Sequence, residues 1–222
     1  MLRATSLVKC YAGAVKPAVD HCDVHIRKGE FLSIVGRSGS GKTTLLHILS
    51  SLIKPDSGTV LFHDRDICSV TEKVRNRLRG KEFAVIFQQY HLLPHLTALE
   101  NVLLPFLNSF IPVKQEHIAS ARAILERVGL AHKEQSRPGQ LSGGEQQRVA
   151  IARALVRGAR MLFADEPTGN LDFATGASII ELLRELNKDG ISIVMVTHND
   201  EFAGQSDRMI RMADGKILQC HR

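Results

Sequence analysis

Residues 31–49 read FLSIVGRSGSGKTTLLHIL, and this stretch decides the fold. Its first five residues, Phe31–Val35, are apolar apart from one serine, which is typical of a parallel strand covered on both faces. The next eight residues, 36–43, match the pattern G-x-x-x-x-G-K-[ST] in full. Three leucines then share one face of a helix that we expect to begin near Lys42 (Leu45, Leu49 and Leu52). The stretch therefore predicts a glycine-rich loop between a buried strand and a helix.

This loop has the composition of a phosphate-binding loop. Glycines let the backbone turn and point N–H groups at phosphate oxygens, and the following helix directs its positive end at the same charge. Lys42 is expected to bind the β- and γ-phosphates, and the Thr43 hydroxyl to ligate Mg²⁺. The residues predicted to contact the nucleotide here are Gly36, Arg37, Ser38, Gly39, Ser40, Gly41, Lys42, Thr43 and Thr44.

Two further apolar runs, residues 161–164 and 191–196, have the same strand-like character as the first. Between them, four residues share one face of a predicted helix that ends before Gly190 (Ile179, Leu182, Leu183 and Leu186). Alternating strands and helices predict an α/β fold with a parallel sheet.

Other segments predict an antiparallel edge layer and a helical insertion. Residues 2–8, 19–26 and 59–62 have the pattern of short antiparallel strands, and two more strand-like runs occupy 209–212 and 216–220. Between Gln88 and Leu141 the pattern becomes helical. Four residues there are in phase and a glycine follows them as a C-cap (Ile118, Ala121, Leu125 and Val128, then Gly129).

The run 161–164 ends in Asp165-Glu166, which suits a strand that delivers two carboxylates to the C-terminal edge of the sheet. Asp165 is expected to hold Mg²⁺, through water, and Glu166 to orient and deprotonate the attacking water. The alternative is an acidic pair that only caps the next helix.

Residues 141–148, LSGGEQQR, open an amphipathic helix. Ser142 and Glu145 have the spacing of a capping box, so an ordinary helix start is one explanation. The adjacent Gly143 and Gly144 lower helix stability and leave this terminus open to a phosphate. One phosphate loop and a second phosphate-binding terminus in the same chain suggest a dimer.

Composition excludes several classes of protein. The 222 residues, 44% hydrophobic and 23% charged, argue against disorder and small disulfide scaffolds. The apolar runs are far shorter than the ~20 residues needed to cross a bilayer, and no secretion signal is recognised at the start, so the default compartment is the cytoplasm. The net charge of +6 permits a polyanion or an anionic membrane surface as a neighbour. With 5% aromatic residues and no tryptophan, a platform for stacking nucleic-acid bases is not expected.

The four cysteines lie far apart and have neither zinc-site nor redox spacing, so we read them as ordinary thiols (Cys10, Cys22, Cys68 and Cys220).

Taken together, these motifs make the chain similar to the nucleotide-binding subunits of ABC transporters along nearly its whole length. LSGGEQQR resembles the family signature almost letter for letter. Gln88, after the apolar run 83–87, matches the Q-loop glutamine, and residues 169–172, GNLD, match the D-loop. His198 matches the switch histidine, and Tyr11 is placed like the aromatic residue that stacks on adenine.

The resemblance implies an α/β P-loop NTPase fold of the ABC ATPase type. We expect a mostly parallel sheet core, an antiparallel β edge layer and a helical subdomain. The whole chain, 1–222, would be one ABC ATPase domain, with its core at about 1–87 and 160–222 and its helical subdomain at about 88–159.

The resemblance also implies a head-to-tail homodimer around two ATP molecules, in which Ser142, Gly143 and Gly144 act on the partner's nucleotide. Mg²⁺ would be held by Thr43, Gln88 and Asp165, and catalysis would rest on Glu166, His198, Gln88 and Lys42. Gly36, Gln88, Asp165 and His198 each follow or end a strand-like run, and ligands of open α/β sheets bind at such ends.

The implied partners are integral membrane permease subunits, on which the ATPase would sit as a peripheral protein at the cytoplasmic face of the inner membrane. It would make no direct contact with the transported substrate or with nucleic acid. Residues 89–112 are the candidate docking surface. We expect most of their leucines to form the core of the helical subdomain and an exposed minority to receive the partner.

Within the family, HLLPHLTALENVLLP is most similar to the ATPases of lipoprotein-releasing (Lol) systems. The alternatives are a macrolide or peptide exporter and an FtsE-like cell-division complex. A nucleic-acid or ribosome ATPase is less favoured, because 88–141 is too short for a long coiled coil and only one phosphate loop is present.

Overall fold

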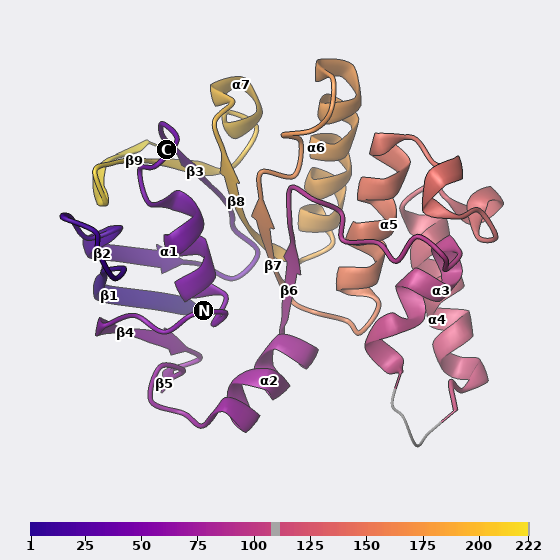
Figure 1. The fold of residues 1–222 in the computed structure, drawn as a ribbon, viewed down its shortest axis with the longest axis horizontal. Coiled ribbons are helices and arrows are strands. Elements are labelled where there is room, and N and C mark those ends of the chain that lie inside the picture. Colours follow the sequence, from indigo (N-terminus) through magenta and orange to yellow (C-terminus); the bar gives the residue numbers. More distant parts are fainter. Residues whose placement is uncertain (108–111, 222) are drawn as a thin grey trace.

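A six-stranded sheet forms the centre of the structure, a computed structural model that describes residues 1–107 and 112–221 (Figure 1). Its strand order is β10-β9-β3-β8-β7-β6, and only β10 runs antiparallel to its neighbour. The predicted parallel sheet is confirmed. The strands are β3 (Phe31–Val35), β6 (Phe83–Ile86), β7 (Met161–Asp165), β8 (Ser192–Thr197), β9 (Arg208–Ala213) and β10 (Lys216–His221).

A second, four-stranded sheet is antiparallel throughout, in the order β2-β1-β4-β5, and confirms the predicted edge layer. Helix α1 (Lys42–Leu49) buries its leucines in a core shared by this sheet and one face of the central sheet. The strands are β1 (Leu2–Lys9), β2 (Val19–Ile26), β4 (Ser57–Phe62) and β5 (Arg65–Asp66).

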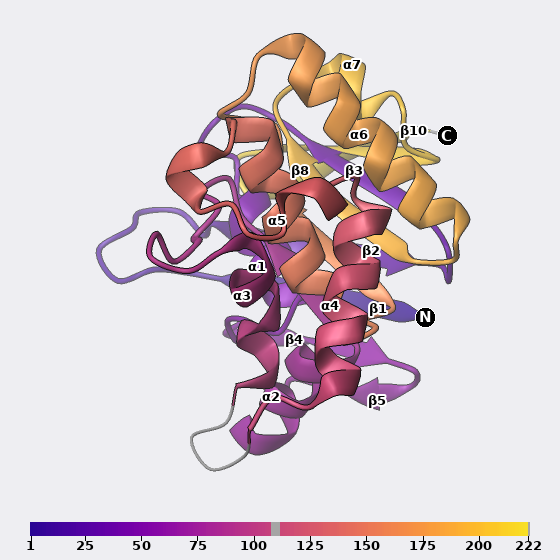
Figure 2. The ribbon, with the colours of Figure 1, turned by 90° about the vertical axis from the view of Figure 1, so that its right-hand side faces the viewer.

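The opposite face of the central sheet is covered by α5 (Gly143–Leu155) and α6 (Phe173–Lys188). Helices α3 (Ala98–Leu103) and α4 (Gln115–Arg127) extend this second core away from the sheet in Figure 1 and lie nearest the viewer in Figure 2. The four residues predicted to share a face of α6 are all buried, and Gly129, at φ +79°, follows α4 as expected. Three 3₁₀ turns lie between these helices: η1 (Leu104–Phe106), η2 (Ala131–Lys133) and η3 (Pro138–Gln140).

Three features differ from the sequence-based expectations. Leu52 lies outside α1 and is 37% exposed, because the chain turns at Ser51, which has a left-handed backbone at φ +62°. Helices α2 (Glu72–Lys81) and α7 (Asp200–Ala203) were not anticipated. The first has only two apolar side chains and the second only four residues, so neither carries a readable hydrophobic period.

Only three of the seven leucines in the segment 89–107 belong to the core of the helical part, so the expectation that most of them form this core is wrong: Leu99 and Leu103 are buried, and Leu92 packs against the same core. Leu93 and Leu107 remain exposed at 47% and 58%. Residues 108–111 of the expected docking surface lie outside the described residues, as does the Cys220 side chain. The other three cysteines are free thiols. No helix in the described ranges is long and apolar enough to cross a bilayer.

Candidate active site

The glycine-rich loop leaves the C-terminal end of β3 and leads directly into α1. Two of its glycines have no room for a side chain. A Cβ on Gly36 would lie 2.3 Å from the carbonyl oxygen of Met212, and one on Gly41 would lie 1.9 Å from that of Ala18. Gly41 also has φ +98° and precedes a helix N-terminus without a side-chain cap. The amide groups of this terminus are therefore open to an anionic ligand.

A cavity of about 520 Å³ lies in front of this helix terminus. Lys42 is buried within it, and its ammonium group donates to the carbonyl oxygens of Gly36 (2.9 Å) and Arg37 (3.0 Å). The cavity is lined by Ala18, Ser38, Gly39, Ser40, Gly41, Lys42, Thr43, Thr44, Gln88, Glu166 and His198. Residues from five separate chain segments thus surround one cleft that holds both the Lys42 ammonium group and the Glu166 carboxylate.

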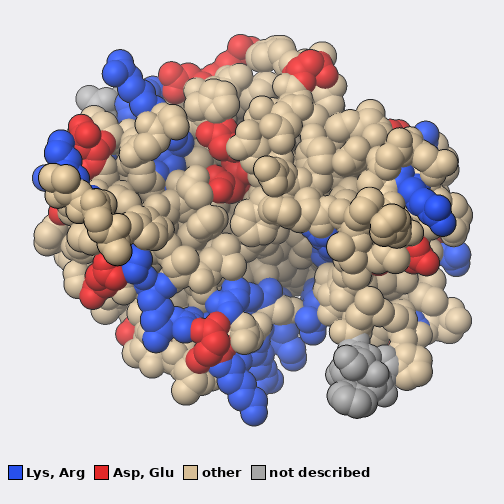
Figure 3. All heavy atoms as spheres, in the orientation of Figure 1, with Lys and Arg blue, Asp and Glu red and all other residues tan. Residues whose placement is uncertain are grey.

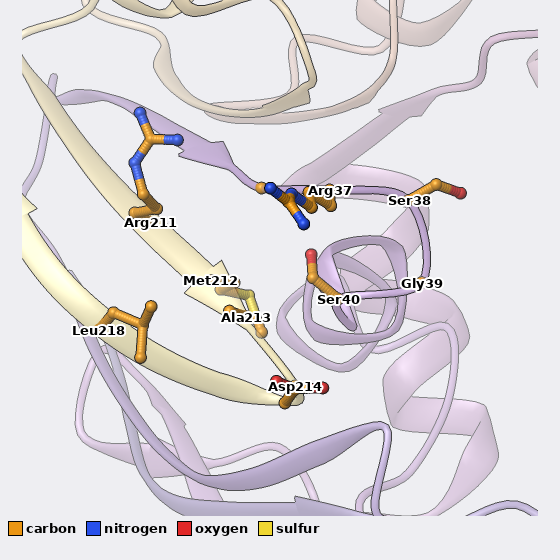
Figure 4. Close-up of a pocket in the computed structure, with 10 residues that line it drawn as sticks. Arg37, Ser38, Gly39, Ser40, Arg211, Met212, Ala213, Asp214 and Leu218 are labelled. Carbon is orange, nitrogen blue, oxygen red and sulfur yellow. The ribbon is translucent and has the colours of Figure 1, made fainter.

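Two residues of the predicted loop, Gly36 and Arg37, do not line this cleft. The Arg37 side chain lines a second cavity of about 370 Å³, formed by the loop and the β9–β10 hairpin (Figure 4). Arg211 and Asp214 of that hairpin line the same cavity. Only the carbonyl oxygen of Arg37 faces Lys42. Gly36 and Arg37 thus line only this second cavity, whereas residues 38–40 line both it and the cleft.

Strand register explains why the other polar groups meet at the loop. Val35 at the end of β3 is paired with Thr197 of β8, and Val196 of β8 is paired with Asp165 of β7. Ile86 ends β6 one strand further along. The ends of four parallel strands thus form one edge, as expected for the binding edge of an open α/β sheet.

Thr43 and Asp165 face each other across this edge. The threonine hydroxyl donates to Oδ1 of Asp165 at 2.9 Å. His47, one turn after Thr43, places Nε2 3.7 Å from the other carboxylate oxygen. Burial lowers the pKa of His47, and the nearby Asp165 only partly opposes this effect. His47 was not predicted as a site residue, although its i,i+4 spacing from Thr43 places it on the same helix face.

A hydroxyl and a carboxylate that already touch are a donor set that suits Mg²⁺, a hard cation that prefers oxygen ligands. In the described ranges, no three His, Cys, Asp or Glu residues form a metal cluster. A magnesium ion at this edge would therefore need oxygen ligands beyond the carboxylate, such as the threonine hydroxyl and phosphate oxygens.

Glu166 lies one residue beyond β7 in a left-handed backbone conformation, at φ +48°. Its N–H donates to the carbonyl oxygen of Val196, which anchors the strained turn to β8. The carboxylate lies 2.9 Å from Nδ1 of His198. A non-glycine residue at positive φ costs free energy, and such strain often occurs at functional sites.

Gln88 follows β6 and is held by the segment 169–172. Its amide nitrogen donates to Oδ1 of Asn170 at 3.2 Å, and the Asn170 amide donates to the Gln88 carbonyl oxygen at 3.0 Å. A Cβ on Gly169 would lie 2.8 Å from Nε2 of Gln88. The predicted Q-loop and D-loop residues are therefore in direct contact.

Tyr11 does not line the cleft. It lies in the connection between β1 and β2, the residue is 48% exposed, and Lys9 Nζ is 6.0 Å from the ring centroid. Ala18, at the end of the same connection, does line the cleft. The Tyr11 ring is therefore open to a planar partner, beside the cleft rather than in it.

The predicted second phosphate-binding terminus lies on α5, apart from the cleft. Ser142 caps this helix, and its hydroxyl accepts from the Glu145 N–H at 3.3 Å while the Glu145 carboxylate accepts from the Ser142 N–H at 2.7 Å. A Cβ on Gly144 would lie 2.5 Å from Cγ2 of Thr175, and one on Gly143 would lie 3.1 Å from Leu171. Close packing is thus one reason for these glycines. Neither they nor Ser142 line the Lys42 cleft.

Comparison with known proteins identifies the family. The family model described as ABC transporter matches residues 19–169, more than half of the chain. The chain belongs to the ABC transporter family. As a member that carries the ATPase motifs, it is an ATP-binding and ATP-hydrolysing cassette.

Among curated proteins, the chain is 47% identical over 207 residues to the lipoprotein-releasing system ATP-binding protein LolD 2 of Rhodopirellula baltica, which covers 90% of this chain and 81% of that protein. It is 48% identical over 198 residues to LolD of Myxococcus xanthus, with 87% of each chain covered. It is also 43% identical to the macrolide export ATP-binding/permease protein MacB of Nitrosomonas europaea, covering 98% of this chain but only 33% of MacB.

Solved structures confirm the fold. The ATP-binding cassette MJ0796, in a dimeric post-hydrolysis state bound to ADP and Pi, superposes with a TM-score of 0.89 at 37% identity. The match covers 100% of this chain and 98% of that one. The mixed, mostly parallel sheet with an antiparallel layer and helices is therefore the ABC ATPase fold.

Proposed function

We propose that this chain is the ATP-hydrolysing subunit of a transporter that releases lipoproteins from the bacterial inner membrane. One observation carries the ATPase assignment: Lys42, Gln88, Glu166 and His198, from four chain segments, line one cleft. The lipoprotein assignment rests on the LolD relatives, which are 47–48% identical over most of both chains. The whole chain would act as one ABC ATPase domain, with its core at about 1–87 and 160–222 and its helical subdomain at about 88–159.

The residues of the cleft divide the work of hydrolysis. Lys42 exchanges its two carbonyl partners for the β- and γ-phosphates, while the amides of the loop bind the remaining phosphate oxygens. Glu166 orients the attacking water and accepts its proton. His198 contacts the Glu166 carboxylate through Nδ1, and its other ring nitrogen would contact the γ-phosphate. Arg37 contributes its backbone, and Tyr11 stacks on the base.

Mg²⁺ would be held by Thr43 and Asp165, with Gln88 as a further oxygen ligand. When bound, the ion supplies neutralisation of the phosphate charge. Gln88 is also tied to Asn170, so its amide links the cleft to the segment 169–172.

We propose a head-to-tail homodimer because the phosphate-binding loop and the N-terminus of α5 lie apart in one chain. Each ATP would be bound by the loop of one chain and the α5 terminus of the other. Ser142, Gly143 and Gly144 lie at an N-terminal helix end outside their own chain's cleft, and there they would bind the γ-phosphate of the partner's ATP. The MJ0796 cassette is dimeric in a state bound to ADP and Pi, which supports this arrangement.

Integral membrane permease subunits would dock on the cassette at the cytoplasmic face of the inner membrane. The exposed side chains Leu93 and Leu107 offer an apolar contact there. A groove of about 260 Å³ lies close by, between α2, β6, η1 and α5, and Pro105 and Arg157 line it. The transported lipoprotein and nucleic acid would make no direct contact with this chain.

A second candidate function is export of a macrolide or of another small molecule. The MacB relative is 43% identical, only slightly below the LolD relatives, and the pyoverdine exporter PvdT of Pseudomonas fluorescens is 44% identical over 213 residues. In those proteins the matched segment is about a third of the chain.

The deciding experiment traps the ATP-bound dimer in native membranes with Glu166→Gln and identifies the proteins that purify with it in mild detergent. The matched control is Glu166→Gln combined with Lys42→Ala, which should not trap. Recovery of membrane subunits together with lipoproteins supports the proposal. A drug-exporter partner moves the function to the second candidate, and soluble partners alone overturn both.

A further inference from the structure

The positive charge of this chain is concentrated in one short helix. Five of the 29 Lys and Arg residues and one of the 23 Asp and Glu residues lie in α2, so these ten residues carry a formal charge of +4 out of +6 for the whole chain. Figure 3 shows the result as a group of blue side chains over α2 at the lower edge of the molecule. The remaining 212 residues are nearly neutral, at +2.

One side of α2 holds the helix to the protein. Leu78 packs against the core beneath the antiparallel sheet. Arg79 donates to the Ser51 carbonyl oxygen, and both Arg79 and Arg75 pair with Glu72. These two arginines are therefore committed to contacts within the protein.

The other side carries a stripe of three exposed cations: Lys73, Arg77 and Lys81. At spacings of i, i+4 and i+8 they lie within about 80° of the helix circumference. Within residues 1–107 and 112–221, none of these three side chains forms a hydrogen bond or an ion pair. Like charges at i,i+4 destabilise a helix, so helix stability does not account for this basic stripe.

The position of α2 indicates what the basic stripe meets. Arg79 and Gly80 line the same groove as Pro105 and Arg157, which lies beside the surface where we place the membrane subunits. In Figure 1, α2 lies at the same end of the molecule as the lower ends of α3 and α4. A cassette docked there brings the basic stripe close to the plane of the bilayer.

We propose that the basic stripe Lys73–Arg77–Lys81 binds the anionic phospholipid headgroups of the cytoplasmic leaflet beside the membrane subunit. The inference rests on the proposed membrane location. The cytoplasmic leaflet is negatively charged and attracts cations within a Debye length of its surface. The stripe has no aromatic residue for stacking on bases, which favours lipid phosphates over nucleic acid.

The test is co-sedimentation of the full-length chain with vesicles of phosphatidylcholine alone or with about 30% phosphatidylglycerol. Each cation near an anionic surface contributes about a fivefold gain in binding. We expect the chain to bind the anionic vesicles only, and the variant K73E/R77E/K81E to bind them roughly 100-fold more weakly. High salt should abolish binding of the unmodified chain.

Two controls separate the basic stripe from net charge and from folding. K73R/R77K/K81R keeps every charge and should bind vesicles like the unmodified chain. K28E/R184E/K188E reverses three exposed cations at or near α6, which covers the opposite face of the central sheet, and should keep most of the binding. All variants should hydrolyse ATP at the unmodified rate, since no substituted residue lines the cleft.

Three outcomes would overturn the inference. The chain could bind neutral and anionic vesicles equally, or K73E/R77E/K81E could bind anionic vesicles as well as the unmodified chain does. The two charge-reversal variants could also lose vesicle binding to the same extent. Binding to duplex DNA but not to vesicles would assign the basic stripe to nucleic acid instead. If the unmodified chain did not hydrolyse ATP, the proposed function would be refuted. If it hydrolysed ATP but did not bind anionic vesicles, only this inference would be refuted.

Discussion

Nδ1 of His198 lies 2.9 Å from Oε2 of Glu166, although 32 residues separate them in the chain. The contact arises because the two residues follow β7 and β8, which are neighbours in parallel register. The imidazole therefore holds the carboxylate in one orientation at the mouth of the cleft, and the carboxylate in turn fixes the ring. In the proposed mechanism, water placement by Glu166 and phosphate contact by His198 would therefore depend on each other through this bond.

Replacing Glu166 by Gln should separate ATP binding from hydrolysis. The amide keeps the size of the side chain and can still bond to His198, but it cannot accept a proton from water. We expect ATP affinity to stay within about twofold and steady-state turnover to fall by at least about 100-fold, the usual contribution of a general base. Nucleotide titration and phosphate release measure the two effects. Turnover close to that of the unmodified chain would remove Glu166 from the role of base.

Replacing Lys42 by Ala should weaken the binding of ATP. In the structure the ammonium group bonds to the loop carbonyls of Gly36 and Arg37, and phosphate oxygens would replace them as partners. Charge-assisted hydrogen bonds of this kind contribute about 1.5–3 kcal/mol, so ATP affinity should fall by about 10- to 100-fold. Calorimetric titration with ATP measures this affinity. The exposed Lys54 serves as the matched control, because Lys54→Ala should leave affinity unchanged. Equal affinities in Lys42→Ala and the unmodified chain would contradict the assignment.

The sequence predicts the central parts of this site because strand ends and site residues coincide. Gln88, Asp165 and His198 each follow or end an apolar run, and parallel strands place such positions at one edge. The side-chain directions could not be predicted in the same way. Arg37 belongs to the loop motif, yet its side chain lines the second cavity, because the β9–β10 hairpin brings distant residues beside it.

The fold shows the same limit. The central strands are uniformly apolar and are easily recognised, whereas α2 is visible only as a charged segment with two apolar residues. Its helix is stabilised by tertiary contacts such as the bond from Arg79 to Ser51, which no local pattern reveals. The end of α1 was missed for a related reason. Ser51 adopts a left-handed backbone conformation, which cannot be predicted from a serine, and Leu52 therefore does not lie on the face of α1.

Gly144→Ala should destabilise the chain through one contact. The added methyl group would lie 2.5 Å from Cγ2 of Thr175, whose hydroxyl bonds to Asp172 and so keeps the side chain in place. We expect a loss of about 1–3 kcal/mol in the free energy of unfolding, typical of overpacking. Urea denaturation measures this value.

Thr175→Ser provides the matched partner for this substitution, because it removes Cγ2 and keeps the hydroxyl bond to Asp172. In the double variant the new methyl group has room, and most of the lost stability should return. A double-mutant cycle should therefore give a coupling of about 1–2 kcal/mol. Strictly additive losses would show that the contact with Thr175 is not what excludes a side chain at Gly144.

Glu30 should make stability depend on pH in the acid range. It is only 7% exposed, and its carboxylate accepts from the Arg208 guanidinium at 2.6 Å and from the Arg27 N–H at 2.7 Å. Burial alone would raise the pKa of Glu30, but these hydrogen bonds and the two arginine charges outweigh it and hold the pKa below its ordinary value. A carboxylate with a lowered folded-state pKa stabilises the fold above its unfolded value and loses that contribution as the pH falls through the folded value.

Glu30→Gln should therefore cost about 2 kcal/mol at pH 7, the typical contribution of hydrogen bonds to a charged group. It should also reduce the loss of stability between about pH 5 and pH 3, since the glutamine does not titrate there. Urea unfolding at about pH 5 and about pH 3 gives the change in the free energy of unfolding between the two pH values for each variant. Glu181→Gln, at an exposed position on α6, is the control and should keep the unmodified pH dependence. A Glu30→Gln variant whose stability falls with acid as steeply as that of the unmodified chain would show that the pair with Arg208 does not set the acid limit.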